Sequence, residues 1–157
     1  MELVLRALAP EDAAPARAYL SAVLAGTRYR ARALEVLEHA LAFEDPEYMV
    51  LLALDANEGA LQGLALFGTV AGARSVVKVH GVASSRLDAA VALLEAVRHA
   101  SEQSGERMIV CELPDDPVVS MLAAALDAAG YVEQGRVPDF IADGVALRLL
   151  VRPLSTE

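Results

Sequence analysis

Cysteine is almost absent from this sequence. The 157 residues include one cysteine, Cys111, which excludes an intramolecular disulfide and a metal site built from cysteines. His39 and His99 have no second ligand-type residue at metal-binding spacing, so we expect no metal. A cytoplasmic location is the simplest expectation for a chain without disulfides.

Basic residues are scarce and never form a run. There are 13 of them against 22 acidic residues, giving a net charge of −9, and Lys78 is the only lysine. Nucleic-acid binding needs a basic stripe that neutralises phosphates, so we expect no nucleic-acid partner. The same acidity would repel an anionic cofactor unless a local cradle offset it.

Long hydrophobic runs are missing as well. Hydrophobic residues make up 55% of the chain and the mean hydropathy is +0.40, yet no stretch approaches the roughly 18 apolar residues of a membrane span. The segment 1–6 also lacks the charged start and apolar stretch of an export signal. We find no repeat or linker, and the length predicts one domain over 1–157.

Apolar periodicity and turn residues divide the chain into strands and helices. Helical spacing predicts a helix that follows Pro10-Glu11-Asp12 and is closed by Gly26-Thr27, and further helices over 31–43, 87–103 and 117–129. Short apolar runs bounded by turn signals predict strands over 3–8, 48–54, 61–70, 75–82, 108–113, 132 onward and 145–151. This order predicts an α/β (α+β) fold with a mixed central sheet, in which an antiparallel meander leads into a parallel crossover.

Three segments carry a family resemblance. Residues 5–12 are similar to an opening strand and turn, residues 58–65 to a second hairpin, and Gly130-Tyr131 to a Gly-aromatic pair after the last helix. In this order they resemble the GNAT superfamily of acyl-CoA-dependent N-acyltransferases over nearly the whole chain. The resemblance implies transfer of an acyl group, such as acetyl from acetyl-CoA, to an amine of a small molecule or peptide.

The resemblance also implies where the cofactor would bind. The strands 75–82 and 108–113 should splay and hold the acyl-pantetheine, with backbone N–H groups between Val79 and Val82 facing the acyl oxygen. The pyrophosphate should rest on the start of helix 87–103, because orphan N–H groups and the helix dipole favour an anion there. The implied contacts of that turn are Ser85, Arg86, Leu87 and Ala90.

This turn departs from the family pattern of Arg or Gln, two residues, Gly, one residue, and Gly or Ala. Ser85 stands at the basic position and Asp88 at a glycine, while Ala90 fits. From the residues alone, Ser85 and Asp88 predict a capping box that already uses the helix N–H groups. Arg86 would then be the remaining phosphate contact.

The family's usual proton donor is also missing. The tyrosine expected five residues before Tyr131 is Leu126, and an earlier asparagine is Val119. Ser120 is a candidate donor at the neighbouring position, with an ordinary structural serine as the alternative.

Two further residues are candidate bases. His80 near the end of strand 75–82 has a suitable pKa range, and Glu112 on strand 108–113 would face away from Cys111 by alternation. The alternatives are a hydrogen-bonded edge histidine and a solvated carboxylate. Cys111 itself is expected in the core, and Asp116 before Pro117 as a helix cap.

Two functions therefore stand at this stage. One is an N-acyltransferase; the alternative is a catalytically degenerate binding or assembly module with the same fold. A homodimer through the last two strands is a further expectation.

Overall fold

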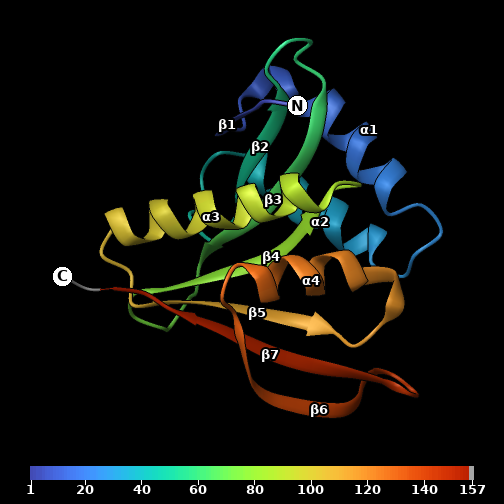
Figure 1. Ribbon diagram of the computed structural model, residues 1–157, viewed down its shortest axis with the longest axis vertical. Helices are drawn as coiled ribbons and strands as arrows, with labels where there is room; N and C mark the ends of the chain where they lie inside the picture. Colours follow the sequence, from blue (N-terminus) through green and yellow to red (C-terminus); the bar gives the residue numbers. More distant parts are fainter. Residues whose placement is uncertain (156–157) are drawn as a thin grey trace.

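The computed structural model describes residues 1–155, which form one seven-stranded sheet in the order β1-β2-β3-β4-β5-β7-β6 (Figure 1). Its strands are β1 (Leu3–Ala7), β2 (Met49–Asp55), β3 (Leu61–Thr69), β4 (Val76–Ala83), β5 (Met108–Pro114), β6 (Val132–Ala142) and β7 (Val145–Pro153). Neighbours pair antiparallel except β4 and β5, which are parallel. The predicted mixed sheet is confirmed.

Helices cover the two faces of the sheet unequally. They are α1 (Ala13–Val23), α2 (Arg30–Ala40), α3 (Leu87–Gln103) and α4 (Ser120–Ala128). One core lies between α3, α4 and strands β2 to β5 and β7, and the other lies between α1, α2 and strands β2 to β4. The face of β5, β7 and β6 on the side of α1 and α2 contributes no residue to that second core.

Local signals explain most element boundaries. Gly105 (φ 75°) and Gly130 (φ 86°) end α3 and α4 in the left-handed conformation that glycine adopts without strain. Asp116 accepts a hydrogen bond from Val118 N at 3.1 Å and Pro117 follows it, as the sequence predicts for a cap. The chain after this cap first forms a short 3-10 helix, Pro117–Val119, and α4 begins only at Ser120.

One predicted helix is shorter than expected. Helix α2 ends at Ala40, whereas apolar spacing predicted it to Phe43. The backbone of Phe43 takes a positive φ of 54° and starts the loop that reaches Pro46. The apolar spacing of Leu37 and Leu41 carries no information on backbone conformation, so it predicted a helix end three residues too late.

None of the helices in residues 1–155 combines the length and apolar character of a membrane span.

Candidate functional site

Strands β4 and β5 part in the middle of the sheet. They pair in parallel from Val76↔Met108 to Val79↔Cys111. Beyond this point β4 continues to Ala83, and within residues 1–155 it has no further register partner on β5. The continuation of β5, Glu112–Pro114, pairs with β7 only. The predicted splay between these strands is therefore present, and the two ribbons diverge in Figure 1.

A β-bulge in β4 lies at the parting point. Leu66 pairs with Gly81, whereas the next residue, Phe67, pairs with Val79, which leaves His80 as the extra residue. A bulge re-aims the side chains that follow it. Val82 accordingly packs against the core of α3 and α4, and Ala83 belongs to the core of α1 and α2.

The imidazole of His80 is held by a backbone carbonyl and an aromatic ring. Its Nε2 lies 2.9 Å from the Glu47 carbonyl oxygen and therefore donates to it, since a carbonyl only accepts. The ring stacks on Tyr48 at 5.4 Å, and Tyr48 stacks on His39 at 4.8 Å. In the neutral form this arrangement leaves Nδ1 as a proton acceptor.

Burial favours the neutral form of the His80 imidazole. Desolvation lowers the pKa of the imidazole below its usual value, and the positive charges of Lys78 and Arg32 act in the same direction. The hydrogen bond to the Glu47 carbonyl opposes them, but burial is the larger effect. The alternative of a hydrogen-bonded histidine is therefore confirmed, and the role of His80 as a base stays a prediction.

Glycine at position 68 allows the loop before β2 to approach β3. A Cβ on Gly68 would lie 2.1 Å from the Glu47 carbonyl oxygen and 2.6 Å from that of Pro46. Thr69 N donates to Pro46 O at 3.0 Å and fixes the same contact. The acceptor of the His80 hydrogen bond is therefore in place because position 68 has no side chain.

Lys78 and Glu112 connect the two parting strands. The Lys78 Nζ lies 3.6 Å from Glu112 Oε2, and their side chains are 31% and 49% exposed. Val79 and Cys111 are buried on the opposite face, so alternation places both charged groups on the side of α1 and α2. As predicted, Glu112 faces away from Cys111.

The first turn of α3 differs from the predicted capping box. Arg86, not Ser85, is the N-cap, and no side chain caps it. The Asp88 carboxylate instead accepts two hydrogen bonds from the Arg86 guanidinium, at 2.7 and 3.0 Å, and one from Ala89 N at 2.9 Å. The capping-box prediction was wrong, because a box formed by Ser85 and Asp88 requires Ser85 as the N-cap and the helix starts one residue later.

Arg86 and Asp88 neutralise one another at this helix start. The hydrogen bonds from Arg86 lower the pKa of Asp88, and the same contact raises the pKa of Arg86. The carboxylate takes the favourable place for an anion near the helix N-terminus. A pyrophosphate at this turn has to compete with Asp88 for both the guanidinium and the Ala89 N–H.

Ser84, which the sequence reasoning did not single out, organises the turn before α3. Its Oγ accepts from Arg86 N at 3.0 Å and lies 2.8 Å from the Gln62 carbonyl oxygen, to which it can donate. Ser85 is exposed. Ser84 stands two residues before the N-cap residue Arg86 and accepts its N–H. Serine at this spacing is typical of a turn closed by a side-chain hydrogen bond, so the pattern would have indicated Ser84.

Three of the other residues implied as cofactor contacts have buried or partly buried side chains. Val79 and Ala90 are buried in the core, and Val82 packs against it. Leu87 is 46% exposed at the start of α3.

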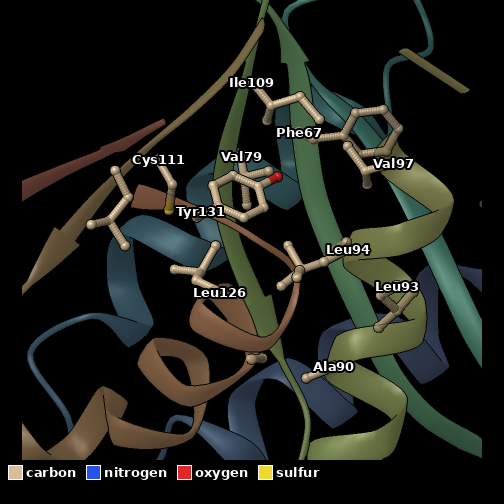
Figure 2. Packing of buried hydrophobic residues seen from close by; sticks show 14 of the residues in the cluster. Phe67, Val79, Ala90, Leu93, Leu94, Val97, Ile109, Cys111, Leu126 and Tyr131 are labelled. Atoms are coloured by element: carbon tan, nitrogen blue, oxygen red, sulfur yellow. The ribbon is translucent and has the colours of Figure 1, made fainter. Parts of the chain in front are cut away.

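Leu126, at the position of the family tyrosine, is a core residue. It is fully buried beside Val79, Cys111 and Tyr131 on the α3 and α4 side of the parting strands (Figure 2). Burial raises the pKa of the Cys111 thiol to about 12, so Cys111 is a packing residue as predicted. Val119 packs at the edge of this core, and Ser120 is exposed at the start of α4.

The phenol of Tyr131 is buried in the same region. Its hydroxyl has no hydrogen-bond partner among the described residues, and burial raises its pKa. Figure 2 shows the ring beside Leu126 and Cys111, with its oxygen directed toward Val97 and Phe67. The hydroxyl is therefore aimed into the core and not at the Lys78 and Glu112 side.

Asp115 and Asp116 both have structural partners. Asp116 accepts from the Tyr29 hydroxyl at 2.7 Å, and Asp115 pairs with Arg136 at 2.7 Å. The Tyr29 contact joins the α1–α2 loop to the start of the 3-10 turn before α4. Burial, together with Asp116, raises the pKa of Tyr29 to about 12.

A surface cavity of about 420 Å³ lies between the loop 43–46 and strand β2. Tyr48 lines it and also stacks on His80, and most of the other lining side chains are apolar. Within residues 1–155 no group of three His, Cys, Asp or Glu residues is arranged to hold a metal ion.

Known structures share this architecture. A GNAT-family protein from Desulfovibrio desulfuricans superposes with a TM-score of 0.83 at 17% identity, covering 98% of this chain and all of the other. The phosphinothricin acetyltransferase of Sinorhizobium meliloti, solved in complex with acetyl-CoA, gives 0.76 at 16% identity over 99% of this chain and 90% of its own.

The ribosomal-protein-S18-alanine N-acetyltransferase of Escherichia coli gives a TM-score of 0.75 at 13% identity, with 99% and 96% of the two chains covered. No protein-family model matches the sequence, and no curated protein matches it either. The fold of this chain is that of the GNAT acetyltransferases, and at these identities the likeness defines the fold alone.

Proposed function

We propose that this protein is an N-acyltransferase that moves an acyl group, in the simplest case acetyl, from acyl-CoA to an amine. The observation that carries the proposal is the parting of β4 and β5 after Val79↔Cys111, directly before the start of α3. Two proteins with this fold, the acetyltransferases from Escherichia coli and Sinorhizobium meliloti named above, support it, and the second was solved with acetyl-CoA bound.

The backbone of β4 beyond Val79 is suited to the acyl end of the cofactor. This segment has no register partner on β5 among the described residues, so β5 does not pair with the backbone groups between Val79 and Val82 on that side. A backbone N–H aimed at the acyl oxygen stabilises the charge that develops in the tetrahedral intermediate. The amine would approach from the face that carries His80, Lys78 and Glu112.

His80 and Glu112 are the proposed proton acceptors for the amine. The lowered pKa of His80 favours the neutral ring, in which Nδ1 can accept a proton, and Glu112 is exposed near the parting point. Proton removal is needed because an ammonium has no lone pair for attack on the thioester. Ser120 is proposed only as a proton donor to the leaving thiolate, from an exposed position at the start of α4.

A second function is favoured by the Arg86–Asp88 pair. A carboxylate already at the start of α3 opposes a pyrophosphate there, as expected for a binding or assembly module without turnover. An assay of CoA thiol release with acetyl-CoA and a panel of amines and amine-bearing peptides separates the two. Amine-dependent thiol release supports the transferase, whereas no thiol release with any amine, whether or not acetyl-CoA binds, supports the module.

A further inference from the structure

Lys78 is the only lysine of the chain, and it lies beside the point where β4 and β5 part. It pairs with Val110, one step before the last pair, Val79↔Cys111. The other basic side chains are arginines, which stay protonated and do not act as amine nucleophiles. The chain therefore carries a single side-chain amine, placed next to the proposed thioester site.

The Lys78 side chain is directed toward the parting point. Its own strand neighbours Val77 and Val79 are buried in the core of α3 and α4, so Lys78 leaves from the opposite face. Although Lys78 is level with Val110, its ammonium meets Glu112, two residues further along β5. The ammonium thus lies between the strands at the level where pairing ends.

The contact between Lys78 and Glu112 is loose. An N–O distance of 3.6 Å exceeds the usual range of an N–H···O hydrogen bond, and both side chains are partly exposed. Exposed ion pairs of this kind contribute little to stability and break easily. The amine is consequently near a carboxylate that can accept a proton, without being locked to it.

From this placement we propose that Lys78 is an acyl acceptor of the protein's own reaction, so that the chain acylates itself. This inference rests on the proposed function, because the acyl-CoA thioester must first occupy the gap. Glu112 removes a proton from the Lys78 ammonium, and the neutral Nζ attacks the thioester carbonyl carbon. The C–N bond forms, the C–S bond breaks, and the second Nζ proton goes to the leaving thiolate.

The products are Nζ-acyl-Lys78 and CoA thiol, and the proton held by Glu112 passes to water. No oxidant or reductant is involved. The amide is uncharged, so acylation removes the ion contact with Glu112 and leaves an acyl group at the face where an external amine would approach.

The test uses the full chain incubated at pH 8 with isotopically labelled acetyl-CoA, followed by intact mass and peptide mapping over time. The terminal amine of Met1 provides an internal reference for uncatalysed acetylation. Uncatalysed acylation favours an α-amine over a lysine side chain, because α-amines as a class release their proton more readily. We expect Lys78 to be acetylated at least about tenfold faster than Met1, because proximity raises the effective concentration of the thioester.

Three controls accompany the wild-type chain. Lys78→Arg retains the charge and should show label at Met1 alone, and Glu112→Gln should slow labelling of Lys78 while leaving that of Met1 unchanged. The urea-denatured chain should lose the preference for Lys78.

Acetyl-CoA binding is measured by calorimetry on the same sample. Binding with Lys78 labelled no faster than Met1 overturns this inference and leaves the proposed function intact. Absence of binding overturns both.

Discussion

The carboxylate of Asp88 accepts both hydrogen bonds of the Arg86 guanidinium, at 2.7 and 3.0 Å, and also the Ala89 N–H at 2.9 Å. Asp88 thereby occupies the first turn of α3 in the way a bound anion would. The turn is a built-in competitor for a cofactor phosphate and not an open cradle.

Asp88→Asn should therefore tighten acetyl-CoA binding, by about threefold to tenfold, because it removes a negative charge and frees Arg86. The melting temperature without cofactor should fall slightly, since the carboxylate also favours the helix start. Calorimetric titration measures the first effect and thermal denaturation the second. Glu106→Gln, beyond the other end of α3, is the control for net charge; equal tightening in both variants would refute a local role for Asp88.

Gly68→Ala should destabilise the protein by about 1–3 kcal/mol, because a Cβ there meets the Glu47 backbone and not a flexible side chain. Gly81→Ala on the adjacent strand is the matched control, since a Cβ at that position has nothing within 4 Å. Urea denaturation of both variants checks the difference. Similar losses in the two variants would show that the close approach of Glu47 is not required.

Stability should decrease at acidic pH partly because of His80. The pKa of this ring is lowered in the folded state, so below the unfolded value of roughly 6.5 the unfolded chain binds a proton that the folded chain does not. The free energy of unfolding therefore falls as the pH drops through that value. His80→Gln should lose less stability than wild type between pH 8 and 5.5.

His99→Gln is the control for this comparison, because His99 is exposed on α3. The His99→Gln variant should lose as much stability over the same pH range as wild type. An identical acid response in His80→Gln and wild type would contradict a lowered pKa for the partly buried His80.

Leu126→Tyr should destabilise the protein instead of restoring a proton donor. Leu126 is fully buried among Val79, Cys111 and Tyr131, and a larger side chain there costs about 1–3 kcal/mol through overpacking. Leu126→Met, which keeps the volume, should cost less than about 1.5 kcal/mol. Denaturation curves and thiol-release rates are measured together; a stable tyrosine variant with higher activity would show that this position faces the cofactor.

Most of the fold could be predicted from short sequence patterns at helix ends and along strands. Asp116 with Pro117, Gly105 and Gly130 each fix a helix end through their own backbone and capping chemistry, and the structure places them as predicted. The alternation of buried Cys111 and exposed Glu112 is equally local. Helix α2 was predicted too long, to Phe43, because apolar spacing does not indicate the positive φ of that residue.

The site was less predictable because its geometry depends on distant contacts. The bulge at His80 and its bond to Glu47 join residues 33 apart in sequence, and they require the open space at Gly68. Helix α3 starts one residue later than the capping box required. Ser84, not Ser85, therefore accepts the hydrogen bond in the turn, and Asp88 pairs with Arg86. Patterns of residue type do not resolve such a shift.

Binding of acetyl-CoA is the most direct measurement of the central claim that the parted strands β4 and β5 receive an acyl-CoA. A ligand present at about 100 times its Kd stabilises the folded state by about 2.7 kcal/mol, which for a chain of this size raises the melting temperature by roughly 5–10 °C. We predict such a rise with millimolar acetyl-CoA. An unchanged melting temperature at that concentration would contradict the account.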